Sequence, residues 1–170
     1  MTTASKNTDL FSSLDDTIAE MLSIISSVEE KDINTIPFEN SWTAGQLVDH
    51  VTRSINGMAE ALEMPGKIAD RKPAEKANEL KAVFLNFDRK MKSPPFILPT
   101  KDVYEKDSLT DKFKSATNKF LETAKTVEPS ELLNLQPLGE LTKLEVLYFI
   151  LFHTQRHTHQ LKNIAEKINH

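Results

Sequence analysis

Residues 142–168 read TKLEVLYFILFHTQRHTHQLKNIAEKI, and this stretch decides the fold. Its apolar side chains recur every three or four residues, which is the period of an amphipathic helix. Thr142 and Glu145 stand three residues apart at its start, as in a capping box, where each side chain satisfies a free backbone donor. We therefore predict a helix from Thr142 to about Ile168, with one face turned into a hydrophobic core.

The same helical period appears upstream in residues 9–31, 43–64, 74–91 and 108–127. Asp9 is a suitable N-cap for the first segment, and Thr43 with Gln46 repeats the capping-box spacing at the start of the second. Only 4 of the 170 residues are glycine, which also favours helices.

The connections between these segments contain most of the prolines. Residues 93–99, SPPFILP, favour an extended crossing, because proline fixes its own φ angle and restricts the residue before it. Pro129 and Pro137 bracket a loop with a short Leu-rich turn, and no segment shows sustained strand alternation. We expect a single all-α domain over residues 1–170, a four-helix bundle with an extra short helix in the middle crossover and a frayed tail at residues 1–8.

Composition excludes several classes of function. The net charge is −4 with no long basic run, which argues against a nucleic-acid partner. The longest apolar run, Val146–Phe152, is far shorter than the roughly 20 residues of a membrane span, and residues 1–16 lack the apolar core of a secretory signal. We therefore expect a cytoplasmic protein. Because the chain has no cysteine, any metal must be held by nitrogen and oxygen donors.

Three of the five histidines fall within the stretch FHTQRHTHQL. On a helix, His153 and His157 are about 40° apart in azimuth and roughly 6 Å apart along the axis. They also lie on the apolar stripe of the last helix, which should face the bundle interior. His50 stands at the margin of the apolar stripe of the second helix. These three histidines are candidate ligands of one ion, since Zn–N bonds bring two donor nitrogens within about 3.4 Å of each other.

The residues alone leave another interpretation open, in which the three histidines are ordinary core residues with hydrogen-bond partners. His159 points away from His157 and is expected at the surface, and His170, which ends the chain, is given no role. The pattern also lacks the glutamate that follows the first histidine in the HExxH motif of metalloproteases.

Two motifs resemble those of a known family. WTAGQLVDH, residues 42–50, resembles the tryptophan-to-histidine motif that opens the second helix in the DinB superfamily, and HTQRHTHQL, residues 153–161, resembles its closing H-x-x-x-H-x-x-Q-L helix. The resemblance implies a four-helix bundle of the DinB/YfiT type in which His50, His153 and His157 bind zinc, nickel or a similar divalent ion. The family more often has glycine where His159 stands, and that departure touches no ligand.

The resemblance also implies partners and an activity. Similar members include bacillithiol transferases and mycothiol-dependent isomerases, and homodimers are frequent. Three neutral ligands leave an ion one open position, where it can lower the pKa of water to about 7 or ionise a small thiol. The first hypothesis is therefore a metal-dependent thiol S-transferase or hydrolase acting on a small molecule. The alternative is a non-catalytic metal-binding or stress-associated dimer.

Several polar residues near the histidines are candidate helpers. Gln160 is placed either to support His157 or to make a simple surface contact, and Arg156 either to hold an anionic substrate or to lie solvated at the surface. Trp42 is expected to plug the end of the bundle, with stacking on a substrate as the other interpretation. The remaining helpers are Gln46, Asp49 and Gln155.

Overall fold

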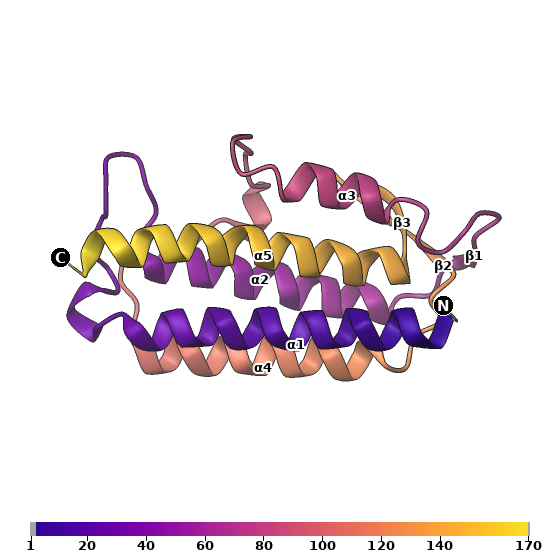
Figure 1. Cartoon of the computed structure of the whole chain (residues 1–170), viewed down its shortest axis with the longest axis horizontal. Coiled ribbons are helices and arrows are strands. Elements are labelled where there is room, and N and C mark those ends of the chain that lie inside the picture. The colour runs from indigo at the N-terminus through magenta and orange to yellow at the C-terminus, as the bar shows by residue number, and fades with distance from the viewer. Residues whose placement is uncertain (1–2, 170) are drawn as a thin grey trace.

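The computed structural model describes residues 3–169, and long helices dominate it (Figure 1). The helices and strands, in chain order, are α1 (Thr3–Ser27), the 3-10 turn η1 (Glu30–Asp32), α2 (Ala44–Glu63), β1 (Lys67–Ile68), α3 (Ala77–Phe84), the 3-10 turn η2 (Pro95–Ile97), α4 (Lys106–Ala124), β2 (Glu131–Leu135), β3 (Gly139–Thr142) and α5 (Lys143–Ile168).

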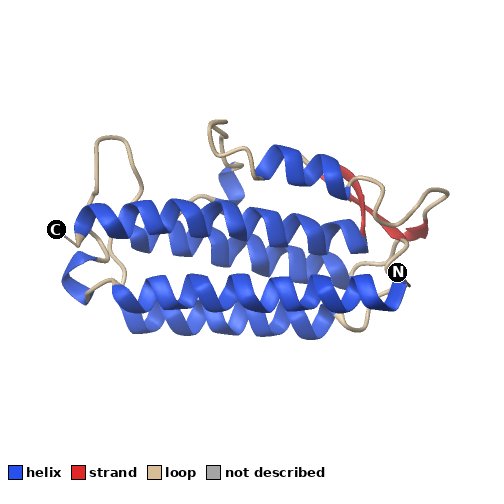
Figure 2. Cartoon of the chain, in the orientation of Figure 1, coloured by secondary structure: helices blue, strands red, loops and turns tan. Residues whose placement is uncertain are grey.

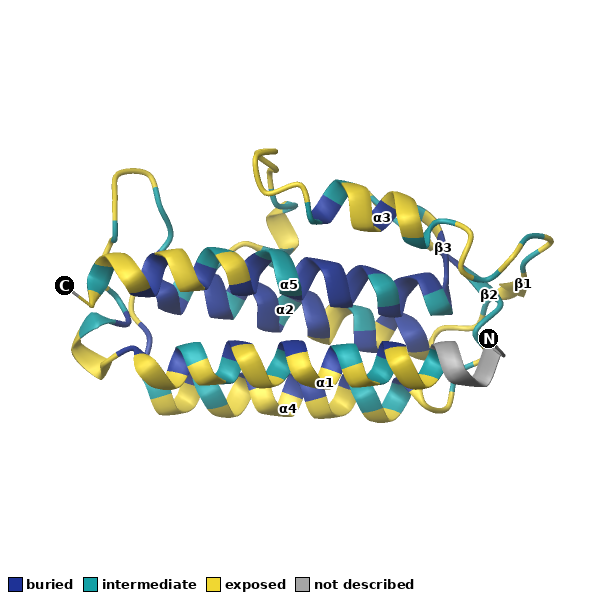
Figure 3. Ribbon diagram, viewed as in Figure 1, coloured by how far each residue is buried: buried dark blue, intermediate teal, exposed yellow. Residues whose placement is uncertain are grey.

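Four of the helices form the bundle. Helix α2 packs against α4 and α5, and α1 packs against α5 and α4, so the four surround one core (Figure 1). Their buried faces are turned toward one another and their exposed faces outward (Figure 3). Helix α3 lies outside the bundle against α5. The predicted all-α four-helix bundle with an additional short helix in the crossover is confirmed.

Both predicted capping boxes are present. The Thr43 hydroxyl accepts a hydrogen bond from the Gln46 N–H, and the Gln46 side chain accepts one from the Thr43 N–H. Thr142 and Glu145 make the equivalent pair at the start of α5. These local contacts fix where the two histidine-bearing helices begin.

Other helix boundaries differ from prediction, most of all at the start of α1 and the end of α3. Helix α1 begins at Thr3, so Asp9 lies inside it and is not its N-cap, because residues 3–8 contain no proline or glycine to stop the helix. Residues 1–2 of the expected tail lie outside the described residues. Helix α3 ends at Phe84 instead of Met91, and Phe87 and Met91, which the helical period of residues 74–91 would place on its apolar face, are exposed.

Three short strands beside the bundle were not expected from the sequence. Residues 131–135, expected as part of a loop, form β2, which pairs antiparallel with β1 on one side and β3 on the other (Figure 2). Strands this short show too few alternations to be recognised, and β2 depends on pairing with β3 across a short turn and with β1 more than sixty residues earlier. Gly139 makes the turn into β3 with a φ of 77°, which glycine adopts without strain.

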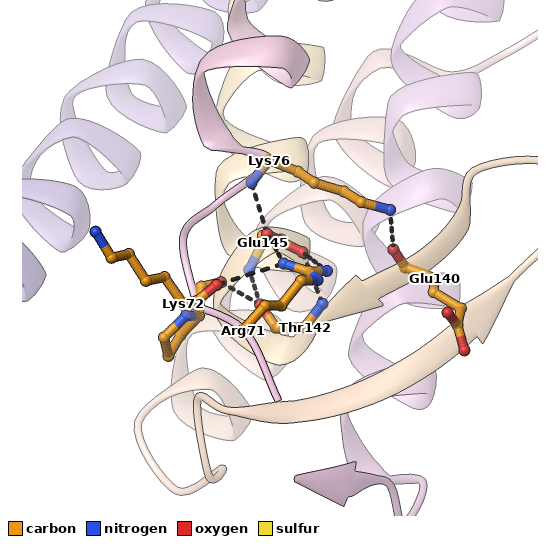
Figure 4. A network of polar contacts seen from close by, with 7 residues as sticks. Arg71, Lys72, Lys76, Glu140, Thr142 and Glu145 are labelled. Carbon is orange, nitrogen blue, oxygen red and sulfur yellow. Dashed lines mark hydrogen bonds and ion pairs between the residues drawn. The ribbon is translucent and has the colours of Figure 1, made fainter. Parts of the chain in front are cut away.

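A buried carboxylate joins this sheet region to α5 (Figure 4). The Glu145 side chain is fully buried and accepts two hydrogen bonds from the Arg71 guanidinium, at 2.6 and 2.8 Å. The backbone N–H groups of Lys76 and Thr142 donate to the same carboxylate. Burial alone would raise the pKa of Glu145, but these donors outweigh burial and lower it. The base of α5 is thus tied to the connection before α3.

Residues 85–105, here called the crossing segment, run from α3 to α4 and contain η2. Arg53 of α2 donates to the Phe96 carbonyl at 2.7 Å, and Asn34 forms two hydrogen bonds with the backbone of Tyr104. Gly45 permits a close approach here, since a Cβ at this position would lie 2.9 Å from Cδ2 of Tyr104. The segment is therefore held along α2, beside His50.

Candidate metal centre

The three histidines nominated from the sequence meet between α2 and α5. One ring nitrogen of each lies within 4.8 Å of the others, and all three residues are buried. The ring centroids of His153 and His157 are 4.5 Å apart, as their four-residue spacing on α5 predicts. The packing of α2 on α5 brings His50 to them, with ring centroids 5.2 Å from His153 and 4.6 Å from His157.

Hydrogen bonds on the outer side of the rings set which nitrogen faces inward. His50 Nδ1 lies 2.8 Å from the Ile97 carbonyl, and His157 Nδ1 lies 3.0 Å from Gln160 Oε1. The Ile97 carbonyl only accepts, so a neutral His50 ring carries its proton on Nδ1 and a lone pair on Nε2. With the Gln160 amide oxygen facing it, a neutral His157 ring does the same. The two Nε2 atoms then face each other at 3.0 Å with no proton between them. A cation between them would resolve this repulsion.

His153 provides a second sign of a missing partner. Its Nδ1 is buried and has no hydrogen-bond partner in the described structure. Buried polar atoms of this kind are uncommon and often indicate an ion or a water molecule. The ring lies among aromatic side chains, 5.2 Å from Phe149 and 6.0 Å from Phe84.

The surroundings of all three imidazoles favour their neutral form. Burial lowers the pKa of His50 and, with the charges of the neighbouring histidines, lowers that of His153 much further. Burial together with His50 lowers the pKa of His157 to about 3. Neutral imidazole is the form that binds metals, so the protein keeps these ligands ready without first removing protons.

The donor set fits a divalent ion of the zinc or nickel type. Imidazole suits both metals, and the 3.0 Å between the two Nε2 atoms is close to the separation of about 3.4 Å expected on one tetrahedral ion. Among the described residues, no aspartate or glutamate joins the group. Three protein ligands without a fourth are the pattern of catalytic sites, in which one position stays open.

The other nominated residues have varied positions. Gln160 contacts His157, in agreement with the supporting role considered for it. Arg156 is half-buried, and its guanidinium donates to the carbonyls of Phe84, Asn86 and Arg89, at and after the end of α3. The Phe84 carbonyl is one of those that a helix end leaves without a partner inside the helix, so Arg156 satisfies the end of α3.

Gln46 and Gln155 make contacts away from the histidine group, and His159 lies at the surface as predicted. Gln46 belongs to the capping box of α2, and Gln155 lies 3.5 Å from Thr17 of α1. His159 is exposed and stacks on Phe87, with ring centroids 4.1 Å apart. His170 lies outside the described residues.

Trp42 is half-buried, with its ring centroid 4.9 Å from that of His50, and so forms a wall of the site instead of only plugging the bundle end.

Sequence reasoning missed Ile97 as the partner of His50. A backbone carbonyl carries no residue-type signal, so nothing in the sequence marks it. The signal that was available is the run of prolines around η2, which predicts a constrained crossing but not its contact with α2.

Comparison with known proteins agrees with this architecture. The model of the DinB superfamily matches residues 13–161, and the chain therefore belongs to the DinB superfamily. A crystal structure of TT2238, described as a four-helix bundle protein, superposes with a TM-score of 0.61 at 15% identity, covering 91% of this chain and 97% of that one. At this identity the likeness concerns the fold alone. A search of curated proteins finds no match.

Proposed function

We propose that this protein binds one divalent metal ion, zinc or nickel, through His50, His153 and His157, and uses it to act on a small molecule as a thiol S-transferase or hydrolase. The facing Nε2 atoms of His50 and His157 carry this proposal, because their outer nitrogens meet acceptors and leave both lone pairs directed inward. Membership of the DinB superfamily supports it.

When bound, such an ion would supply a Lewis acid that makes water or a small thiol a better nucleophile at neutral pH. The protein's own residues would hold and orient it. Ile97 and Gln160 fix the tautomers of His50 and His157, while Trp42 and Phe149 line the site and limit the access of water. Because the chain has no cysteine, a thiol nucleophile would come from a cosubstrate.

A non-catalytic site that only joins helices is the second candidate. A carboxylate as fourth ligand would favour it, and the absence of any acidic residue from the described group argues for the catalytic alternative. A homodimer rests on the family resemblance and a cytoplasmic location on composition, and both remain predictions. No helix in the described part of the chain is long and apolar enough to cross a membrane.

The core-residue interpretation makes a different chemical prediction. It requires His157 to carry its proton on Nε2 and donate it to His50, with the Gln160 amide turned so that its NH₂ group faces Nδ1. The proton position of His157 in the metal-free protein therefore separates a satisfied histidine pair from a prepared metal site.

Metal analysis tests the proposal directly. Purified protein reconstituted with zinc or nickel should hold one ion per chain after removal of free metal, and Co²⁺ should give the visible absorption of a low-symmetry site. His153→Ala should lose stoichiometric binding, and His159→Ala, an exposed histidine on the same helix, should retain it. A wild type without stoichiometric metal refutes the proposal, and a His153→Ala variant with full occupancy refutes this ligand set.

A further inference from the structure

Asp49, the residue before His50, also binds the crossing segment that carries the Ile97 carbonyl. One oxygen of the Asp49 carboxylate accepts hydrogen bonds from the Thr100 N–H at 3.1 Å, the Thr100 hydroxyl at 3.3 Å and the Tyr104 hydroxyl at 2.8 Å. All three donors belong to the crossing segment, whose Ile97 carbonyl faces His50. Asp49 and His50 thus contact the same segment three residues apart, at Thr100 and at Ile97.

The chain between these two contacts is stiff. Pro99 fixes its own φ between Ile97 and Thr100, and Pro94 and Pro95 begin the η2 turn that contains Ile97. Arg53, one helical turn beyond His50, holds the Phe96 carbonyl on the other side. A shift of Thr100 is therefore transmitted to the Ile97 carbonyl, because few backbone angles remain free to absorb it.

Tyr104, whose hydroxyl donates to Asp49, is itself held rigidly in place. Its ring is buried beside Gly45, its backbone is bonded at both ends to Asn34, and its hydroxyl also accepts the Lys101 N–H. The donor that reaches Asp49 is thus fixed by the core and does not depend on a mobile surface loop.

We infer that Asp49 is a positioning residue of the metal centre, which holds the crossing segment so that the Ile97 carbonyl keeps His50 in the Nδ1–H tautomer with Nε2 facing the ion. This inference rests on the proposed function. It assigns Asp49 a role through hydrogen bonds and not through its charge, although that charge also lies close to the site.

Three variants separate these roles. Asp49→Ala removes the acceptor, Asp49→Asn keeps an oxygen acceptor without the charge, and Asp102→Asn removes an equal charge from an exposed residue of the same segment. Two quantities are measured: zinc affinity by competition with a chelator, and the His50 tautomer in the metal-free protein by long-range proton–nitrogen NMR. The second measurement reports on orientation and does not respond to a general loss of stability.

For Asp49→Ala we expect zinc affinity about tenfold lower, the size of effect typical of residues that support ligands, and a mixture of His50 tautomers. Asp49→Asn should recover most of both, and Asp102→Asn should match the wild type. If Asp49→Ala does not fold, Tyr104→Phe, which removes one donor to Asp49, should shift both quantities in the same direction by less.

An unchanged His50 tautomer in Asp49→Ala, or in Tyr104→Phe if that variant carries the test, overturns the inference. Equal defects in Asp49→Asn and Asp49→Ala also overturn it, since charge and not tethering would then be responsible. A wild type that binds no metal refutes the proposed function separately, and the tautomer of the metal-free protein still decides the role of Asp49.

Discussion

The Nε2 atoms of His50 and His157 lie 3.0 Å apart although 107 residues separate them in the chain. Each ring is held from behind, His50 by the Ile97 carbonyl and His157 by Gln160. Such support restrains the rings before an ion binds, so less side-chain freedom is lost on binding. It also fixes which nitrogen each ring presents to the ion. Both supports can be tested, one through Asp49 as described above and the other directly.

Replacing Gln160 should weaken metal binding without removing a ligand. Gln160→Ala leaves His157 Nδ1 without its acceptor, so we expect zinc affinity to fall at least about tenfold. Gln155→Ala is the matched control, because Gln155 lies on the same helix and its side chain bonds to Thr17 of α1, at 3.5 Å. Competition with a chelator measures both. Equal affinities of the two variants would show that Gln160 does not orient His157.

Acid should destabilise the metal-free protein in a range set by the buried histidines. The pKa of His157 falls from 6.5 to about 3 on folding, because of burial and the neighbouring His50. Between these values the unfolded chain binds a proton that the folded protein does not, so the free energy of unfolding decreases as the pH falls. The slope approaches about 1.4 kcal/mol per pH unit for each such histidine.

Urea titrations in the presence of a chelator, between about pH 7 and pH 5, measure this slope. A His157→Gln variant should show a shallower dependence on pH than the wild type. Parallel pH dependences in the two proteins would contradict the assignment of a neutral, buried His157.

Removing Arg71 should destabilise the fold strongly. Arg71→Met leaves the fully buried Glu145 carboxylate with only its backbone donors, and breaking a buried ion pair in this way typically costs about 3–5 kcal/mol. We expect a loss near the lower limit, because those donors remain. Lys125→Ala, which breaks an exposed pair with Glu122, should leave the urea midpoint unchanged. Similar midpoints for both variants would argue against the importance of the buried network.

Replacing either of two glycines of α2 by alanine should change the stability, in opposite directions. A Cβ on Gly45 would lie 2.9 Å from the Tyr104 ring and 3.2 Å from the Ile33 carbonyl, so Gly45→Ala should destabilise by about 1–3 kcal/mol. Gly57 has no neighbouring atom within 4 Å of that position, so Gly57→Ala should stabilise by about 0.5–1 kcal/mol. Urea unfolding measures both, and stabilisation by Gly45→Ala would show that Tyr104 does not need to lie so close to α2.

Features that depend on near neighbours could be predicted from the sequence. The capping boxes at Thr43 and Thr142 involve residues three apart, so their residue types alone locate the starts of α2 and α5. The spacing of His153 and His157 places both on one face for the same reason, since helix geometry is fixed locally. His159 could be excluded from the group by this geometry too.

Features that depend on distant partners were predicted incorrectly or not at all. Strand β2 was expected as a loop, because five residues carry little pattern and one of its two partners, β1, lies more than sixty residues earlier. The carbonyls of Phe84 and Asn86, at and just after the end of α3, bond to Arg156, more than sixty residues further along the chain. Neither contact has a signal in the local sequence.

The sequence by itself determined a helical bundle with two histidines on one face of its last helix, because helix period and capping act over a few residues. Only the tertiary structure decided which nitrogen each ring offers, because the acceptor behind His50 is the backbone carbonyl of Ile97, 47 residues away, and is positioned by the packing of the crossing segment on α2. The positions of the histidines in the chain follow from the sequence. The nitrogen that carries the proton and the nitrogen that faces the site follow from the fold.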